Sequence, residues 1–309
     1  MADDPILGGF VISRPAPIVV HNGDTQGFTL ISDVHIGAPQ VDLKLLSREL
    51  ETALEYGDRI LINGDLLDLV VTKDHKRFSG DCIHPRLQGR KDIVNEAIEW
   101  AVEILSPYAH LIDMIGLGNH ETKIEKFSSV DPTKIIVYEL ARLAKERNKD
   151  HVLHYGGYTG YVSYSFLRDG GRRDKRGCLS SRRWVLFYHH GSGGAAPVTK
   201  GMIDFQRKDV WVDADMIWLG HKHNCWNAKV QKISCPRIGN DLDVRDVRHV
   251  MTGAYCDTYV AQSQASIKRH GRRSNYAADW GVAPQGKGGA RVLLQFSNER
   301  ANYEVKVLQ

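Results

Sequence analysis

Polar side chains follow five separate apolar runs of this chain, at the point where each run ends. They form the patterns Asp33-x-His35, Gly64-Asp65-x-x-Asp68, Gly118-Asn119-His120-Glu121, His189-His190 and Gly220-His221-x-His223. Carboxylate, amide oxygen and imidazole are the groups that hold borderline divalent ions such as Mn, Fe or Zn. The recurrence predicts a metal site, and the number of ligands suits two ions about 3.5 to 4 Å apart.

The five apolar runs read as buried strands, at residues 28–31, 59–62, 111–115, 184–188 and 216–219. Between them lie apolar stripes at helical spacing, at residues 41–56, 92–105 and 133–145. From residue 151 onward the runs alternate and are rich in aromatic residues, as in 158–167, 291–296 and 302–308. The pattern predicts an α/β fold with two sheets packed face to face and helices outside. In such folds ligands gather beyond the carboxyl ends of the strands.

Glycine stands beside three of the polar clusters, as Gly64, Gly118 and Gly220. Because glycine has no Cβ, the backbone can turn sharply there and can approach a metal or a substrate closely.

Each polar residue taken alone has a structural alternative. A single histidine such as His35 is more often bonded to backbone, Asp65 can be a helix N-cap, and Asn119 can be a turn residue. These alternatives weaken because the same coincidence has to occur five times. Asp68 is expected to support a ligand by hydrogen bonding. Glu121 can simply begin a helix, where its charge suits the helix dipole.

The order and spacing of the motifs resemble those of calcineurin-like metallophosphoesterases, over residues 33–223, about two thirds of the chain. The resemblance implies a four-layer αββα sandwich of two mixed β-sheets flanked by helices. It also implies one metallophosphoesterase domain over residues 1–309 and a dinuclear, metal-dependent phosphoric ester hydrolase (EC 3.1).

The resemblance further implies roles for single residues. One ion is held by Asp33, His35, Asp65 and His223; Asp65 bridges to a second ion held by Asn119, His189 and His221. A hydroxide between the ions attacks phosphorus, so Asp65 is catalytic as well as a ligand. His120, the second catalytic residue, stabilises the phosphoryl group or protonates the leaving oxygen. Manganese is the favoured ion because hard oxygen atoms share the site with imidazole, with Fe, Zn and Ni as alternatives.

Two adjacent histidines compete for one ligand position. Successive side chains of a strand point to opposite faces, so only one of them can face the site. The family usually places the ligand directly after the apolar run, which favours His189. His190 then contacts a ligand or the substrate, or is the alternative ligand.

Positive charge is concentrated in loops rather than spread over the chain. The net charge is +4, yet residues 168–183 hold seven Arg and Lys against two Asp. We expect basic loop insertions at about 73–90, 168–183 and 263–290. Localised basic clusters are typical of phosphate-backbone binding, although they can also be solvated loops. The candidate substrate-binding residues are Lys73, His75, Arg77, Arg172, Arg173, Lys175 and Arg176.

Three functions are compatible with these features. The favoured one is a phosphodiesterase acting on DNA or RNA, as a nuclease or end-processing enzyme. The alternative is a hydrolase of a small phosphoester, such as a cyclic nucleotide, a dinucleotide or a phosphomonoester; a catalytically silent protein of the same fold is disfavoured because no ligand is missing. Protein phosphatases of this fold carry Asp-Arg-Gly where this chain has Asp68-Leu69-Val70, which argues against that class. No apolar run reaches the roughly 18 residues of a membrane span, no partner protein is indicated, and a cytoplasmic protein is expected.

Overall fold

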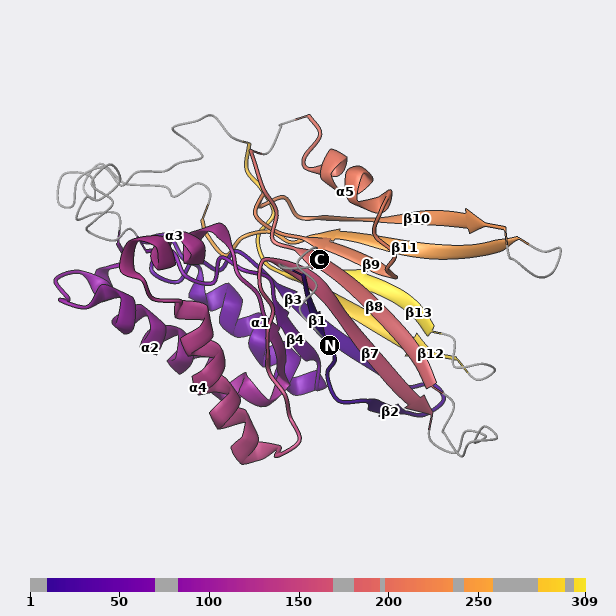
Figure 1. Ribbon diagram of the computed structural model, residues 1–309, viewed down its shortest axis with the longest axis horizontal. Coiled ribbons are helices and arrows are strands. Elements are labelled where there is room, and N and C mark those ends of the chain that lie inside the picture. Colours follow the sequence, from indigo (N-terminus) through magenta and orange to yellow (C-terminus); the bar gives the residue numbers. More distant parts are fainter. Residues whose placement is uncertain are drawn as a thin grey trace, which may run out of the picture.

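Two mixed β-sheets pack face to face, as the sequence predicts, and helices flank them (Figure 1). The computed structural model describes residues 10–69, 83–168, 181–194, 198–235, 242–257, 283–297 and 303–309.

The first sheet has seven strands in the order β1-β7-β8-β9-β11-β10, and β2 also pairs with β7. The strands are β1 (Phe10–Ser13), β2 (Ile18–Val20), β7 (Thr159–Arg168), β8 (Ser181–His189), β9 (Met216–Leu219), β10 (Trp226–Ser234) and β11 (Asp243–Met251). Strands β8, β9 and β11 are parallel neighbours, whereas β7 and β10 run antiparallel to β8 and β11. The ends of β8 and β9 therefore lie at the same edge.

The second sheet has six strands in the order β13-β12-β3-β4-β5-β6. They are β3 (Thr25–Ile31), β4 (Arg59–Ile62), β5 (Ile112–Ile115), β6 (His154–Tyr155), β12 (Ala290–Phe296) and β13 (Tyr303–Leu308). Strands β3 to β6 are parallel, and β12 joins β3 in the opposite direction. The three strands that precede Asp33, Asp65 and Asn119 are thus adjacent and end together.

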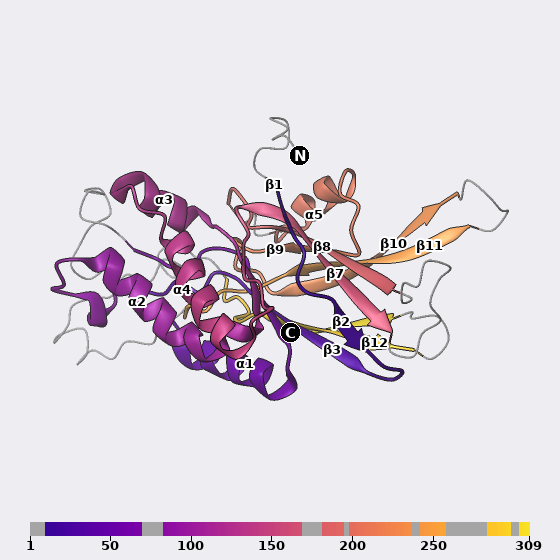
Figure 2. The same cartoon turned by 60° about the horizontal axis from the view of Figure 1, so that its bottom comes forward.

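Helices α1 (Leu43–Tyr56), α2 (Ile93–Leu105) and α4 (Pro132–Arg147) cover the outer face of the six-stranded sheet, and their positions confirm the predicted helical stripes (Figure 2). Each begins at an aspartate that accepts a hydrogen bond from a backbone N–H in the first turn: Asp42, Asp92 and Asp131. Such caps satisfy donors that a helix start leaves unpaired. Two 3₁₀ helices, η2 (Pro85–Leu87) and η3 (Ser106–Leu111), border this layer.

Helix α5 (Met202–Asp209) packs on the seven-stranded sheet, and α3 (Asn119–Ser128) begins at the third polar motif. Phe205 of α5 is fully buried in a cluster with Phe187 of β8 and Ile217 of β9. Helix α5 thus supplies the outer layer on that side of the sandwich.

One apolar core lies between the sheets, and a larger one lies between the six-stranded sheet and its helices. Trp184, Leu186 and Tyr188 of β8 are fully buried between the sheets, and the ring of Phe28 on β3 lies 4.8 Å from the Trp184 ring. The intervening Phe187 is also fully buried, but on the opposite face against α5. Strand β8 therefore carries apolar side chains on both of its faces.

The predicted basic insertions at about 73–90, 168–183 and 263–290 lie largely outside the described residues. The same holds for every candidate substrate-binding residue of those loops, from Lys73, His75 and Arg77 to Arg172, Arg173, Lys175 and Arg176. Within the described ranges, no helix is long and apolar enough to cross a membrane.

Candidate metal centre

Hydrogen bonds join the loops that carry the motifs, both within each sheet and between the sheets, where the N–H of His221 donates to the carboxylate of Asp33. The N–H of Asp33 donates to Gly64 O at 3.1 Å, and the N–H of His35 donates to Asp65 O at 3.0 Å. Across the other sheet, the N–H of Gly220 donates to His190 O at 3.1 Å. The predicted convergence of the motifs at one edge is therefore present in the structure.

One group of candidate ligands consists of Asp33, His35 and His223, whose ligand atoms lie within 4.8 Å of one another. The Nε2 atoms of the two histidines are 3.2 Å apart, and His223 Nε2 is 3.4 Å from Asp33 Oδ1. Asp33 and His35 are buried. This arrangement brings together three of the four residues predicted to hold the first ion.

A second group consists of Asp65, His190 and His221, again within 4.8 Å. His190 Nε2 lies 3.1 Å from Asp65 Oδ2 and 4.0 Å from Asp33 Oδ1. The two groups are therefore contiguous, with Asp65 and Asp33 in contact with the same imidazole.

Of the two adjacent histidines, His190 and not His189 faces Asp65. The inward side chains of β8 are Trp184, Leu186 and Tyr188, so the period of two places residue 190 on the inner side and residue 189 on the outer side. The Nδ1 of His190 is 2.8 Å from Asn63 O, which holds the ring in place. His189 is absent from the ligand groups found among the described residues.

His120 lies beside the candidate ligands, at the start of α3. Its Nδ1 is 2.7 Å from Asp68 Oδ1, and its Nε2 is 3.8 Å from Asp65 Oδ2. Asp68 also lies 3.6 Å from His35 Nδ1. Asp68 thus contacts two site histidines, in line with the supporting role expected from the sequence.

The residues present fit divalent cations. Two atoms of the candidate ligands are buried and have no hydrogen-bond partner among the described residues: His35 Nδ1 and Asn119 Oδ1. Buried polar atoms without partners are rare, and a bound ion is one of the accepted explanations for them. Carboxylate, amide oxygen and imidazole together suit a borderline divalent ion.

Electrostatics of the site point the same way. Burial raises the pKa of the Asp65 carboxyl. The nearby His190 and His120 lower this pKa by a larger amount, so it ends below its ordinary value. Burial lowers the pKa of His190, and the carboxylates of Asp65 and Asp33 raise it more, to about 9. The concentrated negative charge therefore draws a proton onto His190, and a cation can supply the same compensation.

Strained backbone is concentrated at the site. Five non-glycine residues of the candidate centre have positive φ, between 48° and 68°: Asp33, His35, Asp65, His221 and His223. This left-handed region is costly for residues with a Cβ, at about 1 to 3 kcal/mol each, and it persists where the surroundings enforce it. We infer that these loops are held for a function rather than for stability.

Two glycines make the convergence sterically feasible. A Cβ at Gly118 would lie 2.1 Å from Asp65 Oδ1, and one at Gly220 would lie 2.7 Å from Asp33 Oδ2. The predicted close approach at these glycines is therefore to the candidate ligands themselves.

Glu121 has a role that sequence reasoning missed. Its buried carboxylate accepts hydrogen bonds from the backbone N–H groups of Asp65 (3.0 Å), Leu67 (2.8 Å) and Gly118 (2.9 Å). The side chain joins the loop after β4 to the loop after β5, so it positions Asp65 and Asn119 relative to each other. The sequence offered one sign of this role, the position of Glu121 in the third motif. That position is equally compatible with a glutamate that simply begins a helix.

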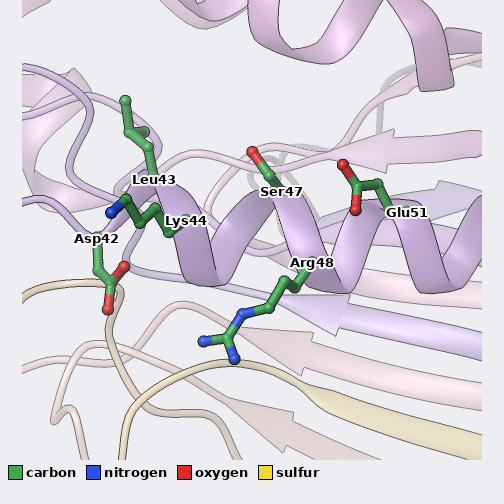
Figure 3. A pocket seen from close by; sticks show the side chains of 6 residues that line it. All are labelled: Asp42, Leu43, Lys44, Ser47, Arg48 and Glu51. Carbon is green, nitrogen blue, oxygen red and sulfur yellow. The ribbon is translucent and has the colours of Figure 1, made fainter.

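A separate hollow of about 590 Å³ lies along α1. Figure 3 shows its side chains on successive turns of that helix: Asp42, Leu43, Lys44, Ser47, Arg48 and Glu51. None of them is a candidate ligand, so the hollow is distinct from the metal centre.

A family model described as calcineurin-like phosphoesterase matches residues 27–225, which include all five motifs. The chain belongs to this family. As a calcineurin-like phosphoesterase, it is similar to a Thermotoga maritima protein solved by NMR, with 13% identity, coverage of 92% of this chain and 99% of that chain, and a TM-score of 0.30. It is also similar to Vacuolar Protein Sorting 29 from Cryptosporidium parvum, with 12% identity, coverage of 92% and 97%, and a TM-score of 0.29. No curated protein matches this phosphoesterase in sequence.

Proposed function

We propose that this phosphoesterase is a two-metal phosphodiesterase that acts on nucleic acid. The observation that carries the proposal is the pair of contiguous ligand groups, Asp33-His35-His223 and Asp65-His190-His221. Asn119, whose buried Oδ1 has no partner among the described residues, is proposed as a further ligand of the second group. The proposed ligand set is therefore the predicted one with His190 in place of His189.

Divalent ions held by these residues, with Mn favoured, would activate water as a nucleophile and stabilise charge on the phosphoryl oxygens. Asp65 is proposed to bridge the two ion positions, because it adjoins both ligand groups. His35 supplies a neutral ring, since burial, and then the charge of His120, lower its pKa to about 4.

His120 is proposed as the proton donor to the leaving oxygen. Burial lowers its pKa, but Asp68 and Asp65 raise it to about 9, so the ring carries a proton near neutral pH. Because its Nδ1 bonds to Asp68, its Nε2 is the nitrogen that remains for a substrate.

Nucleic acid is proposed as the substrate because the basic residues are clustered in the sequence. The stretches 168–183 and 268–273 together carry more positive charge than the net charge of the whole chain, which is the electrostatic pattern of proteins that bind a phosphate backbone.

The test compares hydrolysis of bis-p-nitrophenyl phosphate and p-nitrophenyl phosphate by metal-stripped protein refilled with Mn²⁺. Asp65→Asn serves as the inactive control, and single-stranded DNA serves as competitor. We expect preference for the diester and inhibition by DNA that fades as salt rises. Monoester preference without DNA competition would identify a small phosphoester as substrate, and absence of metal-dependent hydrolysis would refute the enzyme proposal.

A further inference from the structure

His189, which does not contact the candidate ligands, faces the opposite side of β8. It follows Phe187 on that face, and Phe187 packs against Phe205 of α5. The ring of His189 is half-buried and lies edge-on to Tyr158, with ring centroids 5.5 Å apart. It is held beside the metal centre without belonging to it.

The His189 ring presents a defined hydrogen-bond donor. Its Nδ1 accepts the N–H of Gly191 at 2.8 Å, so the ring proton of the neutral form is on Nε2. Among the described residues, Nε2 of His189 has no partner.

Lys208 of α5 is a cation in the neighbourhood of His189. Lys208 is half-buried, and its Nζ forms no ion pair or hydrogen bond with any described residue. Its charged neighbours are Asp204, Lys222 and Arg207, and Asp204 is already paired with Lys222. Lys208 and Lys222 therefore share the carboxylate of Asp204 as a charged neighbour.

A half-buried cation without a partner is costly, and a bound anion would remove that cost. The position is significant because Lys222 lies between His221 and His223, two of the candidate ligands. A molecule whose phosphate is bound at the metal centre can thus extend toward α5.

We propose that His189, Lys208 and Lys222 form a subsite for a second phosphate of the substrate, next to the phosphate that reacts. The inference rests on the proposed function and narrows it: the preferred substrate carries phosphates on both sides of a nucleoside, as a nucleic-acid strand does. His189 donates Nε2–H to the second phosphate, and Lys208 supplies the charge.

The test measures binding as well as turnover, with the full chain loaded with Mn²⁺. Isothermal titration calorimetry compares thymidine 5′-monophosphate with thymidine 3′,5′-bisphosphate, which differ by one phosphate. We expect the bisphosphate to bind about tenfold more tightly, the effect of one charge-assisted contact. Lys208→Met should remove most of that preference, and Lys208→Arg should restore it.

The matched control is Lys145→Met, which removes one exposed lysine from α4, in the helix layer of the other sheet. It should keep the preference of the wild type, whereas His189→Phe should reduce it while retaining a ring against Tyr158. Equal affinities for the two ligands in the wild type, or an unchanged preference in Lys208→Met, would overturn the subsite.

Hydrolysis of the 5′-p-nitrophenyl esters of the same two nucleotides separates the two proposals. Turnover without a bisphosphate preference would refute the subsite alone. A bisphosphate preference that depends on Lys208, in a protein that hydrolyses neither ester, would support the subsite and refute the proposed function.

Discussion

A single methyl group at Gly118 should disrupt the metal centre. The added Cβ would lie 2.1 Å from Asp65 Oδ1 and 2.3 Å from Asp65 N, whereas Cβ contacts under 3.0 Å essentially do not occur. The carboxylate would have to move by about 0.9 Å. The backbone conformation itself suits alanine, with φ of −116°. The destabilisation is therefore steric, and overpacking of this kind typically lowers the free energy of unfolding by about 1 to 3 kcal/mol.

Displacement of Asp65 should weaken metal binding by about 10- to 100-fold, the range seen when the support of a ligand is lost. Titration of metal-stripped protein with Mn²⁺ in a calorimeter measures this change, and urea unfolding measures the stability. Gly194→Ala is the control, because a Cβ there meets nothing within 4 Å. If Gly118→Ala bound Mn²⁺ as tightly as Gly194→Ala, Asp65 would not be a ligand of the kind proposed.

Three further predictions concern single side chains. His190→Asn should lower Mn²⁺ affinity at least about tenfold, whereas His189→Asn should not change it more than twofold; equal effects in calorimetry would contradict the orientation of β8. Glu121→Gln should lower the free energy of urea unfolding by about 1 to 3 kcal/mol, because at least one buried N–H loses its acceptor; unchanged stability would argue against the three backbone hydrogen bonds of Glu121. Burial lowers the pKa of His151, so the unfolded chain binds more protons and stability should fall as the pH drops from about 7 to about 5. The decrease of the free energy of unfolding with falling pH should be shallower in His151→Gln than in the wild type. An identical pH dependence would exclude His151 as a source of the acid sensitivity.

The sequence was sufficient for the fold and for the convergence of the motifs at one edge. Apolar runs ended by Asp, Asn, His and Gly specify both the strands and the edge where they end, so the convergence of Asp33, Asp65 and His221 followed from position alone. The helical stripes were equally readable, because each keeps one apolar face at helical spacing.

The orientation of the adjacent histidines was not readable from the sequence. A half-exposed strand would have shown which residues face inward, but β8 is apolar on both faces, with Trp184 on one and Phe187 on the other. The alternation that decides between His189 and His190 was therefore invisible until the second sheet and α5 were in place.

Two other features depend on tertiary contacts that local patterns do not encode. The three backbone donors of Glu121 come from two different loops, and the partly buried Lys208 reaches the neighbourhood of His189 only because α5 folds onto β8 and β9. A lysine at a helix position otherwise indicates a solvated face.

The most direct test of the two-metal centre is a titration of phosphodiesterase activity against equivalents of Mn²⁺ added to metal-stripped protein. We predict that hydrolysis of bis-p-nitrophenyl phosphate reaches its plateau at two bound ions per chain, and that Asp65→Asn shows neither the second binding event nor the activity. Full activity with one bound ion, or two bound ions without hydrolysis, would contradict the account.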